Sequence, residues 1–168
     1  EDDADSIDAL MKYADMAMYR VKASGKNAYQ FFTEDMNQEA TQRVNMLARM
    51  RNALIHDQFV VFYQPQIEVS NGDIVGVEAL IRWNDPETGM VQPGTFIGLA
   101  EESGFIDALG RFVLERACRQ LADWTEQGIC DVSMSVNLSA RQFRTDGLAD
   151  LIKQVVVETG ADPGHLIL

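Results

Sequence analysis

A carboxylate and a guanidinium stand four residues apart within residues 77–83, which read Val-Glu-Ala-Leu-Ile-Arg-Trp and are otherwise apolar. Side chains alternate between the two faces of a β-strand, so Glu78, Leu80 and Arg82 are predicted to share one face. A carboxylate can bind a divalent cation, and a guanidinium can present several hydrogen-bond donors to a phosphate. The simpler alternative is a salt bridge between Glu78 and Arg82 at the end of a sheet.

Two amide side chains stand at or near the ends of other strand-like segments, Gln64 before a proline and Asn137 near the end of residues 132–138. An amide in such a place often bonds the local backbone, and this is the structural alternative for both residues. Carboxylate and amide oxygens are also suitable ligands for Mg²⁺ or Mn²⁺, and Glu78 and Asn137 qualify by type and position. A divalent cation activates water and offsets phosphate charge, which is the chemistry of phosphodiester hydrolysis.

Further motifs flank residues 77–83. They are Phe62-Tyr63-Gln64-Pro65-Gln66 upstream, and Pro93-Gly94-Thr95-Phe96-Ile97, Ala100-Glu101-Glu102-Ser103-Gly104 and Ser135-Val136-Asn137-Leu138-Ser139 downstream. In this order and spacing the set resembles the EAL family of bacterial cyclic di-GMP phosphodiesterases, whose name-giving triplet stands here as Glu78-Ala79-Leu80. The resemblance covers roughly residues 51–168, with one departure at Gly98, where the family more usually has proline.

The resemblance implies that this chain is part of an enzyme that hydrolyses cyclic di-GMP to linear pGpG by water activated with Mg²⁺ or Mn²⁺. It implies that Glu78 and Asn137 bind the metal. Arg82 would contact a phosphate of the bound dinucleotide, with Gln64 and Leu80 beside it. No catalytic residue beyond the metal ligands is expected in this chain. Two alternatives stay open, namely a receptor that binds cyclic di-GMP without cleaving it and a purely structural module for dimerisation or signal relay.

Strand and helix patterns alternate after residue 58, which is typical of a parallel α/β fold. The first two strands are the exception, because Asn71-Gly72 between them favours a type I′ hairpin and an antiparallel pair. With the resemblance, this order predicts an incomplete TIM-like EAL barrel. The expected elements are strands at residues 59–69 and 73–83, a loop at 84–94, helices at 95–103, 106–128 and 147–158, and strands at 132–138 and 165–168.

A TIM-type barrel takes about 250 residues, so residues 58–168 are expected to be the N-terminal half of an EAL domain. The resemblance places further acidic metal ligands and a catalytic lysine after residue 168, and the 168-residue chain alone is therefore expected to be inactive. The strand at 165–168 would leave an open sheet edge, which predicts aggregation or pairing with a second copy as a homodimer.

The N-terminal region resembles the end of a GGDEF diguanylate cyclase domain. The matching motifs are Ala14-Asp15-Met16-Ala17-Met18-Tyr19 and Lys22-Ala23-Ser24-Gly25-Lys26-Asn27. Residues 1–33 are therefore predicted to be the C-terminal remnant of such a domain, with a helix at 6–23 and a strand at 28–32. The cyclase signature loop would precede residue 1, so no cyclase activity is expected here. Residues 34–57 are predicted to form an amphipathic connector helix.

The acidic composition of the chain limits the partners that it is expected to bind. The chain has 26 acidic and 14 basic residues and a formal charge of −12, which disfavours nonspecific binding to nucleic acid polymers or anionic membranes. No apolar run reaches the roughly 20 residues of a membrane-spanning helix, and a cytoplasmic location is expected, with an upstream anchor in the parent protein left open. Cys118 and Cys130 are interpreted as inert structural thiols, and His56 and His165 as structural side chains.

Overall fold

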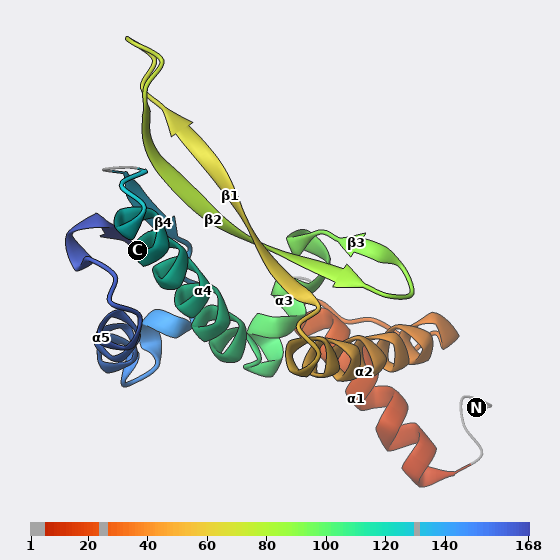
Figure 1. Cartoon of the computed structure of the whole chain (residues 1–168). Helices are drawn as coiled ribbons and strands as arrows, with labels where there is room; N and C mark the ends of the chain where they lie inside the picture. Colours follow the sequence, from red (N-terminus) through yellow and green to blue (C-terminus); the bar gives the residue numbers. More distant parts are fainter. Residues whose placement is uncertain (1–5, 24–26, 130–131) are drawn as a thin grey trace. The chain divides into compact units, whose positions relative to one another are not determined.

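The computed structural model describes residues 6–23, 27–129 and 132–168. The chain divides into two compact units, Glu1–Arg49 and Met50–Leu168. Helix α1 and most of helix α2 belong to the first unit, and the whole sheet belongs to the second (Figure 1). The second unit therefore carries every site residue that the sequence predicted.

Helices are present in the first unit where the sequence predicted them. Helix α1 spans Ile7–Ala23, and helix α2 spans Glu34–Ile55. The strand predicted at residues 28–32 is wrong, because residues 27–33 contain no strand. The Phe32 ring instead stacks on Tyr13 with a centroid distance of 3.9 Å. A strand needs a hydrogen-bonded neighbour, and the described part of this unit provides no second strand.

The described residues of the second unit form a five-stranded sheet with the path β1-β2-β4-β5, and β3 pairs with β2 beside this path. Strands β1 (Phe59–Ile67) and β2 (Ile74–Asp85) run antiparallel. Strand β4 (Ser133–Val136) runs parallel to β2, and β5 (Leu166–Ile167) runs parallel to β4. Helices connect the parallel strands, so the predicted mixed α/β fold with an antiparallel first pair is confirmed (Figure 1).

The turn between β1 and β2 is not the predicted type I′ hairpin. That turn needs positive φ at both central residues, whereas Gly72 has φ +80° and Asn71 is not among the residues with positive φ. Asn71 turns the chain with its side chain: Oδ1 accepts a hydrogen bond from the Asp73 amide at 3.1 Å, and Nδ2 donates to Asp73 Oδ2 at 2.7 Å. Such side-chain bonds compete with the backbone turn that the dipeptide favours.

The loop predicted at residues 84–94 contains a short strand. Strand β2 continues to Asp85, and β3 (Gly89–Val91) returns antiparallel to it. The buried Asp85 carboxylate closes the connection by accepting hydrogen bonds from the Glu87 amide at 3.1 Å and the Thr88 hydroxyl at 2.6 Å. This connection extends the sheet beside Arg82, where the sequence suggested only a loop.

The core lies on one face of the sheet, where helices α4 (Ile106–Glu126) and α5 (Leu148–Thr159) pack. Cys118 is fully buried there as predicted, whereas Cys130 lies outside the described residues. No helix in the described ranges is long and apolar enough to cross a bilayer. Most polar residues of the strands lie on the other face of the sheet. The side chains of the core cluster are Val77, Ala79, Val113, Leu114, Ala117, Cys118, Leu121, Met134, Val136, Val155 and Ala161.

Aromatic packing fixes the end of β2 that carries Arg82. Phe59 and Trp83 are partners in the β1–β2 register, and their ring centroids are 5.6 Å apart. Phe96 from α3 (Pro93–Ser103) lies 5.6 Å from Phe59 and 6.1 Å from Trp83. All three rings are almost completely buried. Because Trp83 is held on the core face, its neighbour Arg82 must point to the opposite face.

Candidate metal and phosphate site

Three neighbouring strands place polar side chains in one row across the open face of the sheet. Glu78 pairs with Gln64 in the antiparallel β1–β2 register and with Ser135 in the parallel β2–β4 register. Directly opposed residues share a face, so these three side chains lie on the same side of the sheet. Val77 and Ala79, which flank Glu78, are buried in the core. The predicted alternation of residues 77–83 is therefore confirmed.

Asn137 lies beside Glu78, although 59 positions separate the two residues in the chain. Val136 is 2% exposed and pairs with Ala79, which places Asn137 one residue beyond this pair and diagonal to Glu78, within reach of its carboxylate. The Asn137 Nδ2 group donates a hydrogen bond to Glu78 Oε1 at 2.6 Å. The structure thus brings together the two metal ligands that the sequence analysis proposed.

The chemistry of this pair fits a hard divalent cation. Glu78 supplies carboxylate oxygens, and rotation of the Asn137 amide would replace the donor Nδ2 with the acceptor Oδ1. Glu78 is half-buried and Asn137 is exposed, so a solvated cation can reach both. Within the described residues no cluster of three or more His, Cys, Asp or Glu side chains is positioned to hold a metal. The two side chains therefore supply a pair of oxygen ligands here rather than a complete coordination shell.

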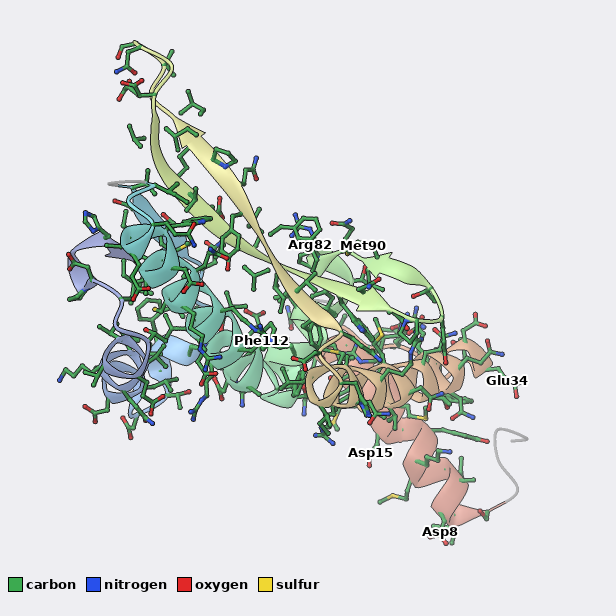
Figure 2. All side chains as sticks on the ribbon, in the orientation of Figure 1. Asp8, Asp15, Glu34, Arg82, Met90 and Phe112 are labelled. Atoms are coloured by element: carbon green, nitrogen blue, oxygen red, sulfur yellow. The ribbon has the colours of Figure 1, made fainter. Side chains whose placement is uncertain are left out.

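Arg82 lies on the same open face, further along β2. Its Nη1 donates to the Ile81 carbonyl at 2.8 Å, and its Cζ lies 5.9 Å from the centroid of the Phe62 ring. No ion pair joins Arg82 to Glu78 in the described part of the chain, so the simple salt bridge considered from the sequence is not formed. Figure 2 shows Arg82 on one side of β2 and Phe112, which packs against the core, on the other.

Apolar side chains form the surface between the carboxylate and the guanidinium. Leu80 is half-buried and pairs with Phe62, whose side chain is 52% exposed. Met90 of β3 pairs with Asn84 and so lies on the same face as Arg82 (Figure 2). An apolar surface beside a cation is suited to packing against a planar base.

Sequence reasoning missed Phe62 and Met90 as parts of this surface. Phe62 could have been found by carrying the period-two alternation across the antiparallel pair, because it opposes Leu80. Met90 required knowledge of β3, which is only three residues long. A strand this short gives almost no periodic signal.

The two histidines and Tyr63 contact groups outside the candidate site. His56 Nδ1 lies 2.8 Å from the Asn52 carbonyl, and His165 Nδ1 lies 3.6 Å from the Asp162 carboxylate. Burial raises the pKa of the Tyr63 hydroxyl, whereas Arg116 lowers it and Asp123 raises it further. Tyr63 alternates with the site-face residue Gln64 and packs against the core, so it stays outside the candidate site.

A comparison with protein families matches the EAL domain over residues 47–168, which is well over half of the chain. Two curated relatives are the Bifunctional diguanylate cyclase/cyclic di-GMP phosphodiesterase MucR of Pseudomonas aeruginosa and the Cyclic di-GMP phosphodiesterase PdeR of Escherichia coli. MucR is 43% identical over 95% of this chain and 23% of its own length. PdeR is 41% identical over 89% of this chain and 22% of its own length.

The solved structure of the PaMucR phosphodiesterase in complex with c-di-GMP is similar to this chain, with a TM-score of 0.70 and 42% identity. The match covers 73% of this chain and 49% of that chain. The FimX EAL domain of Xanthomonas citri, solved in complex with c-diGMP, shares the fold at 24% identity and a TM-score of 0.66, over 77% of this chain and 50% of its own. This chain spans about a fifth of the length of the curated relatives.

Proposed function

This chain belongs to the EAL domain family, and we propose that the protein carrying it hydrolyses cyclic di-GMP to linear pGpG with Mg²⁺ or Mn²⁺. The observation that carries the proposal is the contact between Glu78 and Asn137, two oxygen-bearing side chains brought together from strand β2 and from the residue that follows the parallel strand β4. The names of the relatives support the substrate, because MucR and PdeR are both named cyclic di-GMP phosphodiesterases.

The predicted site residues and Phe62 have distinct roles in this proposal. Glu78 and Asn137 would hold the divalent cation, which when bound supplies an activated water and offsets charge on the phosphodiester. Arg82 would bind a phosphate oxygen with the donors that its bond to the Ile81 carbonyl leaves available. Leu80 and Phe62 would pack against a guanine, and Gln64, opposite Glu78, would hydrogen bond to the dinucleotide.

Local charge explains how an acidic protein could bind this dianionic substrate. The chain has a formal charge of −12, so its long-range field opposes the approach of an anion. The guanidinium of Arg82 and a cation between Glu78 and Asn137 would reverse the sign at the site itself. Binding should therefore depend strongly on these few residues rather than on a broad basic surface.

The domain organisation is part of the same proposal. We assign residues 1–33 to the C-terminal remnant of a GGDEF domain, 34–57 to a connector helix and 58–168 to the N-terminal half of an EAL domain. The match to MucR supports this division, because it covers 159 residues, extends upstream of the EAL match and involves a protein also named a diguanylate cyclase. We also propose a cytoplasmic location.

Hydrolysis assays on the full-length protein test the proposal. Glu78→Gln removes a metal-binding charge with almost no change in volume, and should leave less than about a tenth of the wild-type rate at saturating Mg²⁺. Glu126→Gln is the matched control, because Glu126 is exposed at the end of α4, and should leave the rate unchanged. Retained activity in Glu78→Gln would remove Glu78 from the metal site. A wild-type protein that binds cyclic di-GMP without cleaving it would be a receptor.

A further inference from the structure

Two reciprocal hydrogen bonds between Ser139 and Gln142 stabilise the turn that follows Asn137. The Gln142 side chain accepts a hydrogen bond from the Ser139 amide through Oε1 at 3.0 Å, and the Ser139 hydroxyl accepts one from the Gln142 amide at 3.3 Å. This is the capping box of a Ser-x-x-Gln sequence at the start of a helical turn. The turn continues into the short helix η1 (Gln142–Arg144).

The Gln142 side chain is buried and packs tightly against helix α4. Its side chain is 4% exposed, which is unusual for an amide of this length. A Cβ atom built on Gly110 of α4 would lie 2.0 Å from Gln142 Nε2 and 2.9 Å from its Cδ. The absence of a side chain at Gly110 is therefore what allows the Gln142 amide to lie on the helix backbone.

The same turn touches a second glycine at the junction of α3 and α4. An Arg141 guanidinium nitrogen lies 3.1 Å from the position of a Cβ on Gly104. Gly104 ends α3 with φ +79°, a conformation that glycine adopts without strain. Neighbouring residues of one turn thus meet the α3–α4 segment at two glycines.

This turn is two residues from the proposed metal ligand. On one side of Asn137, Val136 is fixed in β4 by its pairing with Ala79 and by burial. On the other side, Leu138 leads directly to Ser139, whose amide is held by Gln142. The exposed Asn137 side chain has little packing of its own to fix it beyond its bond to Glu78.

We propose that Gln142, seated on Gly110, is a positioning residue that holds Asn137 in the geometry needed to share a divalent cation with Glu78. The inference rests on the proposed metal site and assigns this site a supporting residue on a different element. Groups that orient a metal ligand commonly change metal affinity by about 10- to 100-fold when they are removed. Gln142 acts through the Ser139 amide and the backbone, so its effect must disappear when Asn137 cannot bind the metal.

A double-mutant cycle on Mn²⁺ affinity tests this dependence. Electron paramagnetic resonance titration of the full-length protein measures free Mn²⁺ directly and needs no turnover. Gln142→Met keeps the length of the side chain but removes the oxygen that accepts from Ser139, and should weaken Mn²⁺ binding about tenfold. Asn137→Ala should weaken it at least as much. The double variant should bind Mn²⁺ no more weakly than Asn137→Ala alone, because Gln142 affects the metal only through Asn137.

A glycine pair provides the matched control. Gly110→Ala should displace the Gln142 side chain and weaken Mn²⁺ binding as Gln142→Met does. Gly98→Ala makes the same substitution within helix α3, where the new methyl group meets nothing within 4 Å, and should leave Mn²⁺ affinity unchanged. Thermal unfolding of each variant, followed by circular dichroism, reports whether the fold is retained. If Gly110→Ala does not fold, the cycle with Gln142→Met still decides the question.

The outcomes separate the positioning role from the metal site itself. Unchanged Mn²⁺ affinity in Asn137→Ala would overturn the proposed metal site. A loss in Asn137→Ala with no loss in Gln142→Met would overturn only the positioning role. The positioning role would also be overturned if the loss of Mn²⁺-binding free energy in the double variant equalled the sum of the losses in the single variants. A merely structural residue would act independently of Asn137 in this way.

Discussion

Replacing Arg82 by lysine should weaken the binding of cyclic di-GMP while leaving the fold intact. The guanidinium is fixed by two contacts, a hydrogen bond of 2.8 Å to the Ile81 carbonyl and the Phe62 ring at 5.9 Å. Its remaining donors form a planar fork, which can hold two oxygens of one phosphate. Lysine keeps the positive charge but presents it as a point on a flexible chain.

Arg82→Lys should have a larger effect on the affinity for cyclic di-GMP than on the stability of the fold. A hydrogen bond to a charged group contributes about 1.5–3 kcal/mol, and loss of one such bond at the lower end of this range weakens binding about tenfold. The contact with the half-exposed Phe62 contributes about 0.5–1 kcal/mol at such a site. A lysine ammonium retains part of this contact and can still donate a hydrogen bond to the Ile81 carbonyl. The dissociation constant should therefore rise about tenfold, whereas the free energy of unfolding should change by less than about 1 kcal/mol.

Isothermal titration calorimetry of the full-length protein in EDTA measures this affinity without metal-dependent turnover. Arg119→Lys is the matched control, because Arg119 is exposed on α4 and lies outside the candidate site, and its dissociation constant should equal that of the wild type. An unchanged dissociation constant in Arg82→Lys, with a lowered free energy of unfolding, would assign Arg82 to a structural role and refute the reasoning.

Three further predictions concern the fold. Met134→Ala, at a fully buried position of β4, should lower the free energy of unfolding by about 2–5 kcal/mol in urea titrations; a loss below 1 kcal/mol would contradict the packing described. Burial raises the pKa of the Cys118 thiol, so the thiolate, which is the form that reacts with iodoacetamide, is less populated at pH 8 in the folded chain than in the unfolded chain. Peptide mass spectrometry should therefore find iodoacetamide on Cys118 only after unfolding. The 168-residue chain should self-associate through β5, and Ile167→Lys should reduce its light scattering; a wild-type monomer would refute this.

The fold of the second unit could be predicted because its strands and helices have strong periodic patterns. Alternation along residues 77–83 placed Glu78, Leu80 and Arg82 on one face, and pairing with β1 and β4 confirms that face. The helix end at Gly104 was predictable from glycine's tolerance of positive φ, which is +79° there. Local chemistry alone determines these features.

The features that sequence reasoning missed depend on partners distant in the chain or on side-chain bonds. Residues 28–32 have strand-like composition, but no described strand pairs with them. The Asn71 side chain bonds to Asp73 and replaces the expected type I′ turn. Strand β3 exists because β2 and the Asp85 carboxylate support it. Pairing and side-chain bonding of this kind override local propensity.

The candidate site was only partly visible in the sequence. The types of Glu78 and Asn137 indicated oxygen ligands, but their contact of 2.6 Å follows from the parallel register of β2 and β4. The role proposed for Gln142 had a local signal in the Ser139-x-x-Gln142 pattern, which is a capping box. The close approach to Gly110 had none, because it joins two elements across the fold.

Anomalous diffraction from crystals of the full-length protein grown with Mn²⁺ tests the central claim most directly. We expect a manganese peak within about 2.5 Å of both a Glu78 carboxylate oxygen and the Asn137 amide oxygen, with the hydrogen bond between the two side chains replaced by the cation. A peak elsewhere, or no peak at saturating Mn²⁺ with Asn137 Nδ2 still bonded to Glu78 Oε1, would contradict it.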